Sequence, residues 1–404
     1  MALVYLFERF PSLTQTFCYR EVEELSGLIP RLSVWSIRRP KDMLLDLSAE
    51  LIERVRYLPS QDELDRELGS VRRAILNKYP LSVIWMLRRC KNQLGKYRLR
   101  EAAWLGKRLC QENVDHVHTH FAGIGARTAW WIKKLYGINY SFTGHANDMF
   151  CDSDDSIELS HLVDSSLFVV TVSNFSRLWL EERFPHCRSK IHRIYNGIKI
   201  QEKCSWVGAG SMPLILSVGR LIEKKGFEDL IHACALLRDQ GMVFQCMIVG
   251  GGPLEHALRS QIEELSLGQY VLLAGSMANA DVRVQMSKAD VFVLACVNER
   301  EGGADNLPTV LMEAMDVGLP VVSTRVAGVP EMVDEEKTGL LVSEHDPKAL
   351  AEGIRTLIRD RSKARLMGEN GKKLVGVRFS VKSTVEELQL LFNFYGVSCV
   401  PSRN

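Results

Sequence analysis

Short apolar segments alternate with helical patterns along most of this chain, in two successive rounds. In the first round, strands are expected at residues 4–7, 32–37, 114–117, 140–142, 167–172 and 190–194. In the second round, strands are expected at residues 214–218, 243–249, 270–274, 291–295 and 321–324. Strands separated by helices are typical of parallel sheets with helices on both faces. The pattern therefore predicts an α/β protein with two doubly wound parallel-sheet domains.

A segment of polar and small residues at 203–212 separates the two rounds and is typical of a linker. A chain of 404 residues is long enough for two domains, each with its own core. We therefore expect an N-terminal domain at residues 1–200 and a C-terminal domain at residues 211–379. From residue 347 onward the pattern is helical, and no strand follows the last helix, at about 380–396.

Several classes of protein are disfavoured by composition. The net charge of +2 argues against a dedicated nucleic-acid binder. No apolar run approaches the length of a membrane span, and the N-terminus lacks a charged segment followed by an apolar core, so we expect a cytoplasmic protein. The ten cysteines include no Cys-x-x-Cys pair, which argues against a structural zinc site and a disulfide framework.

Residues 71–110 have the most unusual charge pattern, with eleven Lys or Arg residues against the single Glu101. Trp85, Tyr97 and Trp104 are interleaved with these charges in a helical pattern. A basic helical surface with aromatic side chains suits an anionic membrane face. The alternative is a solvated basic face whose aromatic side chains belong to the core.

A loop and helix at residues 298–320 have the features of an anion site. The expected strand at 291–295 is followed by a polar, Gly-rich loop and then by a helix with Pro308 in its first turn and Gly318 at its end. Unpaired N–H groups and the positive end of the helix dipole face the mouth of such a loop. Two carboxylates, Asp305 and Glu313, frame it, so the stretch suits a nucleotide.

Arg220 and Lys225 lie in another loop that follows a strand, between Gly219 and Gly226. An Arg fork and a mobile Lys charge could neutralise a diphosphate together with the helix dipole, without a metal. The alternative is two solvated surface charges. The chain has no Walker motif and no His/Cys cluster, so metal-dependent phosphoryl transfer is disfavoured.

Two loops of the N-terminal half carry histidines after predicted strands, where ligands bind in parallel sheets. We expect His118 and His120 to be structural, and His145 to be functional because Gly144 lets the backbone approach a ligand and Asp148 could orient the ring. Near the N-terminus, Ser12 and Thr14 could cap a helix or contact a ligand. We favour the capping role.

Together, the motifs resemble retaining glycosyltransferases of family 4. In the C-terminal half, the resemblance rests on Ser217-Val218-Gly219-Arg220 with Lys225-Gly226, on the loop at 249–254 and on the segment 307–315. In the N-terminal half, residues 10–21 and 142–148 look like the subgroup related to the colanic acid glycosyltransferases of exopolysaccharide synthesis. The family implies a GT-B fold, in which two Rossmann-like domains face each other across a cleft and the last helix packs back on the first domain.

The resemblance also implies roles for individual residues. It implies that His145 contacts the donor sugar and Glu313 the ribose. It places the donor diphosphate on Arg220, Lys225 and the backbone of Asn306, Leu307, Pro308 and Thr309. Contacts with sugar or acceptor fall to Ser12, Thr14, Asp148 and Gly303. Asp305 occupies the position of the first acid in a family pattern of two Glu residues, and it is one methylene shorter, so Glu299 or Glu301 could reach in instead.

The activity implied is transfer of a hexose with retention from a UDP- or GDP-type sugar to a lipid-linked or growing saccharide of a surface polysaccharide. We expect no cofactor and no metal, and a location in the cytoplasm, peripheral at the inner membrane face. Two alternatives remain: a GT-B nucleotide-sugar epimerase, and a nucleotide-sugar-binding protein weakened in catalysis by Asp305. A phosphorylase would need a pyridoxal lysine, and a dehydrogenase a Gly-x-Gly-x-x-Gly loop after the first strand; neither motif is present.

Overall fold

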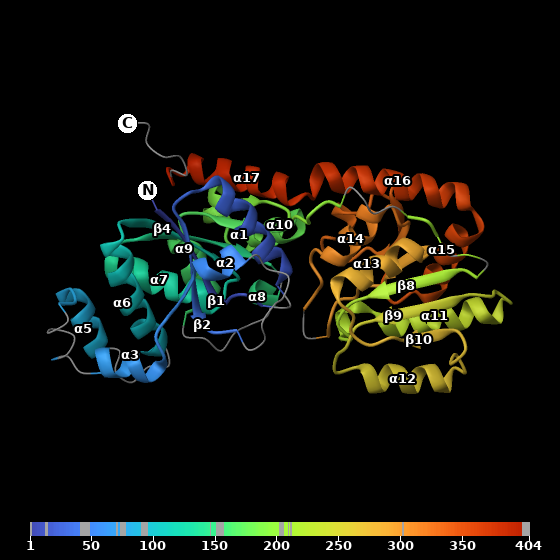
Figure 1. Cartoon of the computed structure of the whole chain (residues 1–404), viewed down its shortest axis with the longest axis horizontal. Helices are drawn as coiled ribbons and strands as arrows, with labels where there is room; N and C mark the ends of the chain where they lie inside the picture. The colour runs from blue at the N-terminus through green and yellow to red at the C-terminus, as the bar shows by residue number, and fades with distance from the viewer. Residues whose placement is uncertain are drawn as a thin grey trace. The chain divides into compact units, whose positions relative to one another are not determined.

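The computed structural model describes residues 2–12, 15–40, 49–69, 72, 78–89, 96–145, 147–150, 157–201, 206–208, 210, 212–300 and 303–397. The chain forms two compact units. Unit 1 comprises residues 1–172, 177–194 and 384–404, and unit 2 comprises residues 173–176 and 195–383. Both are α/β units, coloured in chain order in Figure 1. No helix in the described part of the chain combines the length and the apolar character needed to cross a membrane.

Unit 1 is built on a seven-stranded parallel sheet with the order β3-β2-β1-β4-β5-β6-β7. Its strands are β1 (Ala2–Arg9), β2 (Leu32–Arg38), β3 (Val55–Tyr57), β4 (Val114–His120), β5 (Asn139–Gly144), β6 (Val169–Thr171) and β7 (Ile191–Arg193). Every strand expected in the first round is present. Strand β3, a three-residue edge strand inside a segment with no clear period, was not predicted.

Helices cover both faces of this sheet (Figure 1). They are α1 (Thr16–Leu28), α2 (Ala49–Arg54), α3 (Gln61–Leu68), α5 (Leu81–Arg89), α6 (Lys96–Gln111), α7 (Ile124–Tyr136), α8 (Asn147–Phe150), α9 (Leu159–Ser165) and α10 (Asn174–Arg183). Helix α6 turns an apolar stripe to the core, and Gly106 lies against the ring of Tyr136 on α7, where a Cβ would overlap that ring. The basic segment therefore has a buried face as well as a charged one.

The last helix, α17 (Val381–Phe394), contributes its residues from Thr384 onward to unit 1. Phe392 is fully buried, with its ring edge-on to His116 and His118. Just beyond the helix, Tyr395 lies 2.9 Å from the Nε2 atom of His192. These contacts place the last helix in the core of unit 1.

Unit 2 is built on a six-stranded parallel sheet with the order β10-β9-β8-β11-β12-β13. The strands are β8 (Leu214–Val218), β9 (Gln245–Val249), β10 (Val271–Leu273), β11 (Val291–Leu294), β12 (Val321–Thr324) and β13 (Gly339–Val342), the last of which was missed. The helices are α11 (Phe227–Asp239), α12 (Glu255–Glu264), α13 (Asn279–Lys288), α14 (Thr309–Val317), α15 (Pro347–Arg359) and α16 (Arg361–Arg378). The prediction of two doubly wound parallel sheets is confirmed.

One local prediction, the cap of the first helix, was wrong. Helix α1 begins at Thr16 with Gln15 as N-cap and no side-chain cap, because Ser12 accepts the Gln15 amide through its backbone carbonyl. Thr14 lies outside the described residues. In the expected linker, Trp206 is fixed to unit 2, since its indole N–H donates to the Ala289 carbonyl at 2.6 Å.

Candidate active site

The order of the unit 2 sheet reverses between β8 and β11, which are neighbours at its centre. The chain continues from β8 toward one edge of the sheet and from β11 toward the other. Ligands of open parallel sheets bind at the carboxyl ends of the strands at such a switch point. The loops that follow these two strands hold Arg220 and Lys225 after β8, and Asp305 after β11. The topology therefore brings these predicted residues to one end of the sheet.

Glycines pack the loop after β8 tightly against the loop after β9. The Gly219 amide donates to the Val249 carbonyl at 2.9 Å, and the Leu221 amide donates to the Gly251 carbonyl at 3.1 Å. Gly250 has a φ of +145°, and a Cβ there would overlap the Gly219 carbonyl. The glycine run at 250–252 thus positions the backbone around the exposed Arg220.

Lys225 and Asp305 form an ion pair between the loops that follow β8 and β11. Their side chains are 13% and 17% exposed, so the pair is largely shielded from solvent. Burial alone would lower the pKa of Lys225, but Asp305 and Cys296 together outweigh burial, and the pKa is raised. Lys225 therefore stays charged at neutral pH. Next to it, Gly226 has a φ of +62° and lies against the Ala295 carbonyl, where no Cβ fits.

Helix α14 begins one residue later than expected. Pro308 is the N-cap rather than a first-turn residue, and no side chain caps the helix. The first N–H groups of a helix have no acceptor within it, so this end of α14 can receive an anion. The helix ends as predicted at Gly318, which has a φ of +88°. Glu313 lies half-buried on this helix and Thr309 half-buried at its start.

Asn306 is held by side chains of its own unit. The Ser173 hydroxyl donates to its Oδ1 at 2.6 Å, and its amide nitrogen donates to the Ser176 hydroxyl. The side chain of Asn306 is therefore structural. The predicted phosphate contact would be made by its backbone. Gly303 is buried, and its carbonyl accepts the Glu299 amide at 2.7 Å, which closes the loop before Asp305. Glu301 lies outside the described residues.

Unit 1 contains a buried histidine cluster at the carboxyl ends of β4 and β5. The Nε2 atom of His145 lies 3.0 Å from the Nδ1 atom of His120. The Nε2 atom of His120 lies 3.1 Å from the Glu21 carboxylate, which also accepts the Tyr5 hydroxyl at 2.7 Å. His118 lies 2.8 Å from the Ser141 hydroxyl through its Nδ1 atom. The expectation that His118 and His120 are buried structural residues fits this geometry.

The pKa values in this cluster diverge. Burial alone would lower the pKa of His120, but Cys18 and Glu21 outweigh it and the pKa lies well above its usual value. Burial, reinforced by the charge on His120, holds the pKa of His118 and His145 well below theirs. A protonated His120 donates to both Glu21 and His145. A neutral His145 that accepts through Nε2 carries its own proton on Nδ1.

The contacts of Gly144 and Asp148 differ from those that the sequence suggested. A Cβ at Gly144 would overlap the sulfur of Met149, so this glycine serves close packing rather than the approach of a ligand. The Asp148 carboxylate accepts the backbone amide of His145 at 3.1 Å and that of Ala122 at 2.9 Å. It therefore fixes the loop, while His120 contacts the His145 ring.

Three side-chain groups in the described part of the chain could geometrically hold a metal. They are Cys18/His120/His145, Glu21/His118/His120 and Asp164/His186/Cys187. His120 belongs to the first two groups, and a metal that bound there would have to displace its proton. The absence of a metal remains a prediction.

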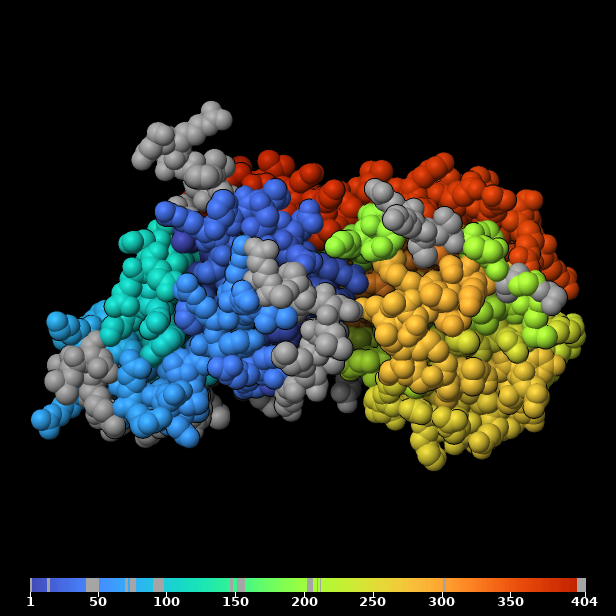
Figure 2. Space-filling view, in the orientation of Figure 1, coloured from blue at the N-terminus to red at the C-terminus, as the bar shows by residue number. Residues whose placement is uncertain are grey.

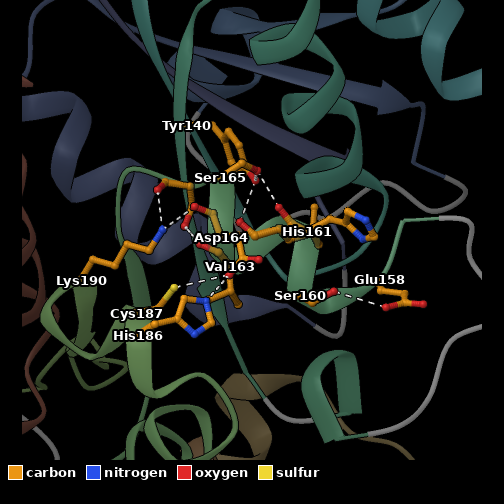
Figure 3. Close-up of polar contacts among 12 residues, drawn as sticks. Tyr140, Glu158, Ser160, His161, Val163, Asp164, Ser165, His186, Cys187 and Lys190 are labelled. Atoms are coloured by element: carbon orange, nitrogen blue, oxygen red, sulfur yellow. Dashed lines mark hydrogen bonds and ion pairs between the residues drawn. The ribbon is translucent and has the colours of Figure 1, made fainter.

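The third group, Asp164/His186/Cys187, lies at the C-terminal end of helix α9. Figure 3 shows Lys190, Cys187 and His186 converging on Asp164. The Lys190 ammonium donates to the Asp164 carbonyl at 2.8 Å and to the Ser166 carbonyl at 3.1 Å. A cation at these last carbonyls satisfies them and complements the helix dipole. The hydrogen bond from His186, reinforced by Cys187, lowers the pKa of Asp164.

Sequence reasoning missed Tyr5, Cys18 and Glu21 as partners of the histidines. Glu21 lies within a segment that carried the resemblance, but no periodicity or spacing links it to residues about one hundred positions away. The signal that could have found it is a Glu on the buried face of α1, because an unpaired buried carboxylate is costly.

Two family models match this chain. The model "Glycosyltransferase Family 4" matches residues 58–202, and the model "Glycosyl transferases group 1" matches residues 205–374. The Escherichia coli protein WcaL, named as a colanic acid biosynthesis glycosyltransferase, is 45% identical over 149 residues, 37% of each chain. The amylovoran biosynthesis glycosyltransferase AmsK of Erwinia amylovora is 41% identical over 137 residues, 34% of each chain. The matches thus span little more than a third of these relatives.

A solved Anabaena protein, HepE in complex with UDP, has a TM-score of 0.70 to this chain at 16% identity. The match covers 98% of this chain and all of that one. This likeness shows a common fold and confirms the predicted GT-B class. The chain belongs to the glycosyltransferases that combine a family 4 domain with a group 1 domain, as the motifs indicated.

Proposed function

We propose that this protein transfers a hexose, with retention, from a nucleotide diphosphate sugar to a saccharide or lipid-linked acceptor in surface polysaccharide synthesis. The observation that carries the proposal is the group of cations at the switch point of unit 2. Arg220 and Lys225 lie there beside a helix N-terminus without a side-chain cap. The names of the relatives in colanic acid and amylovoran synthesis, and the UDP bound to HepE, support a nucleotide-sugar donor.

The proposed chemistry relies on positioning and charge. As the sugar leaves, negative charge accumulates on the diphosphate, and fixed cations and N–H groups stabilise it. Lys225 is already charged and held, so little reorganisation is needed at that moment. The leaving diphosphate itself takes the acceptor proton on the face that the acceptor attacks, which gives retention. Glu313 binds the ribose, and His145 contacts the donor sugar, as the resemblance implies.

We further propose that the reaction needs no metal. Arg220 and the dipole of α14, with Lys225 held by Asp305, bring positive charge to the diphosphate from the protein itself. Transfer should therefore persist in excess EDTA. Loss of transfer in EDTA that Mg²⁺ or Mn²⁺ restores would contradict this part of the proposal.

A peripheral membrane location is supported by helix α5. Leu81 and Trp85 lie one turn apart and are 82% and 54% exposed, while Val83 and Ile84 on the opposite face are buried. Arg88 and Arg89 follow at the end of the helix. Apolar side chains beside arginines on a surface helix favour the anionic headgroup region of a bilayer. Helix α5 lies at the surface of unit 1, in light blue in Figure 2.

The experiment that tests the function is a donor screen with the purified protein. UDP-, GDP- and ADP-sugars are offered with and without lipid-linked saccharide acceptors, and NMR follows the anomeric configuration of donor and product. We expect one donor class to be hydrolysed slowly alone and transferred with retention. Binding of no donor would overturn the proposal, and a free epimerised sugar nucleotide without transfer would favour the epimerase.

A further inference from the structure

Unit 1 holds a cavity of about 1030 Å³ at the carboxyl ends of β2 and β3. It lies beside helices α3 and α6 and is separate from the histidine cluster. Four arginines and two aromatic rings dominate its lining: Arg38, Arg39, Arg98, Arg108, Tyr57 and Trp104. Sites for small ligands commonly have volumes of about 300–1000 Å³, so this cavity has room for several sugar or phosphate groups.

Aromatic rings hold two of the arginines. The Arg39 guanidinium lies 4.7 Å from the centre of the Tyr57 ring, and that of Arg108 lies 5.3 Å from Trp104. Within the described chain, neither forms an ion pair with a carboxylate. A guanidinium stacked on a ring keeps its N–H edge for a planar or tetrahedral oxyanion. The stacking therefore orients the two guanidinium groups without neutralising their charge.

Three acids, Glu63, Glu67 and Glu101, also line the cavity and offset part of this charge, and Arg38 pairs with Glu8 at 3.0 Å. Glu63 is used by the cap of α3, where it accepts the Ser60 amide at 2.8 Å. Glu67 accepts the Trp104 indole N–H at 2.9 Å. Burial raises the pKa of Glu101 to about 7, although Arg98 and Arg38 oppose the rise. A carboxyl group with this pKa is about half neutral at pH 7, so Arg39, Arg98 and Arg108 leave the lining with a small excess of positive charge.

Helix α6 lies between this cavity and helix α5, the helix proposed above to contact the membrane surface. It supplies Arg98, Trp104 and Arg108, and α5 packs on it through the apolar face opposite Leu81 and Trp85. Figure 1 shows α3, α5 and α6 grouped together in unit 1. A cationic cavity near a membrane-facing helix suits a ligand whose anionic group lies at the headgroup level of the bilayer.

We propose that this cavity binds the diphosphate group of the lipid-linked acceptor saccharide. The Arg39 and Arg108 forks bind phosphate oxygens, and the Tyr57 and Trp104 rings lie beside the first sugar. The inference rests on the proposed function and names the substrate class on its acceptor side. The binding site is independent of the donor residues Arg220 and Lys225.

The test uses inorganic pyrophosphate as probe and isothermal titration calorimetry as measurement. The full-length Arg220→Ala/Lys225→Ala variant, weakened at the donor site, is the starting protein. We expect it to bind pyrophosphate, and the further change Arg39→Gln/Arg108→Gln to weaken binding at least about tenfold. The matched control is Arg183→Gln, which removes a guanidinium stacked at the same distance, 5.3 Å, on Trp179 outside the cavity. It should leave binding unchanged.

Two results would overturn the inference. One is unchanged pyrophosphate affinity in the Arg39→Gln/Arg108→Gln variant, with an unaltered melting temperature as the check on folding. The other is binding of glucuronate but not pyrophosphate, which would assign the cavity to a sugar carboxylate. In the transfer assay, the cavity variant should raise the acceptor KM at least about tenfold and change kcat less. Failure of every donor would refute the proposed function while the calorimetry still tests the cavity.

Discussion

The Lys225 ammonium donates a hydrogen bond to the Asp305 carboxylate, which links the loops after β8 and β11. The two residues are eighty positions apart in sequence, and the reversal of strand order in the unit 2 sheet brings them together. Each side chain compensates the charge of the other at a site that is largely shielded from solvent. Removing one partner of such a pair is costly because the other charge stays behind. The pair therefore determines how strongly this end of the sheet attracts an anion.

Replacing Lys225 or Arg220 by alanine should weaken the binding of UDP or GDP by about 1–3 kcal/mol in each case, the range for charge-assisted hydrogen bonds. The loss should be larger for Lys225→Ala, since it also leaves the Asp305 carboxylate to repel the diphosphate. Calorimetry with the nucleoside diphosphates measures both. The control is Lys224→Ala, one position away. Unchanged affinity in both test variants would remove Arg220 and Lys225 from the site.

Asp305→Asn should make nucleotide binding more sensitive to pH. In the wild type, Asp305 and Cys296 together overcome the effect of burial and raise the pKa of Lys225. Without the carboxylate, burial dominates and lowers that pKa. Affinity for the diphosphate should then begin to fall at a lower pH as the pH rises, because Lys225 loses its proton earlier. Binding measured from pH 6 to pH 10 tests this.

Asp305→Glu separates a working enzyme from a weakened binding protein. A longer carboxylate can still pair with Lys225, so the pH profile of binding should remain near that of the wild type. We expect turnover to change by no more than about tenfold, or about 1.4 kcal/mol of activation free energy. A large gain from near-zero activity would instead favour the weakened binding protein.

The strand positions and much of the candidate donor site followed from sequence because they depend on local signals. A short apolar run and a glycine loop mark each strand end, and parallel pairing then collects Arg220, Lys225 and Asp305 at one edge. Edge strands β3 and β13 were missed because three or four residues carry too little pattern. The Pro308 position differed by one residue, within the usual uncertainty of a helix end.

The contacts of the histidine cluster could not be predicted because they depend on tertiary packing. His120 lies in a motif that the sequence analysis singled out, but its partner Glu21 comes from α1, 99 positions away. The contacts of Gly144 and Asp148 could not be predicted for the same reason. A Gly-His pair and a nearby Asp suggest ligand approach and ring orientation, whereas packing assigns Gly144 to Met149 and Asp148 to backbone amides.

Glu21→Gln should destabilise unit 1 by about 3–5 kcal/mol, the cost of leaving a buried charge without its partner. A raised pKa means that the folded state holds the His120 proton more tightly than the unfolded state. The stabilisation that this proton contributes is complete below about pH 6.5, the pKa of His120 in the unfolded state. It is lost as the pH rises through the pKa of His120 in the folded state. The loss in Glu21→Gln should be greatest at low pH in chemical denaturation. Glu24→Gln, on the same helix, is the control.

His116→Gln should make stability less sensitive to acid. Burial, with a smaller contribution from Lys133, lowers the pKa of His116 to about 3. In the unfolded state, His116 binds a proton near pH 6.5, whereas in the folded state it stays neutral at that pH. The free energy of unfolding therefore falls as the pH drops below 6.5. Between pH 6.5 and pH 5, the free energy of unfolding should fall by about 2 kcal/mol more in the wild type than in the variant. Equal loss in the variant would contradict the prediction, and the exposed His161→Gln should behave as wild type.

Helix α5 should determine how strongly the protein binds anionic vesicles. Leu81→Gln/Trp85→Ala removes its exposed apolar side chains, and we expect sedimentation with anionic vesicles to weaken at least about tenfold, as loss of about 1.4 kcal/mol requires. Arg88→Gln/Arg89→Gln should remove about 1 kcal/mol per arginine and reduce the dependence on salt. Leu366→Gln, at a leucine 60% exposed in unit 2, is the matched control. Vesicle binding that survives both α5 variants would return this segment to the alternative of a solvated basic face.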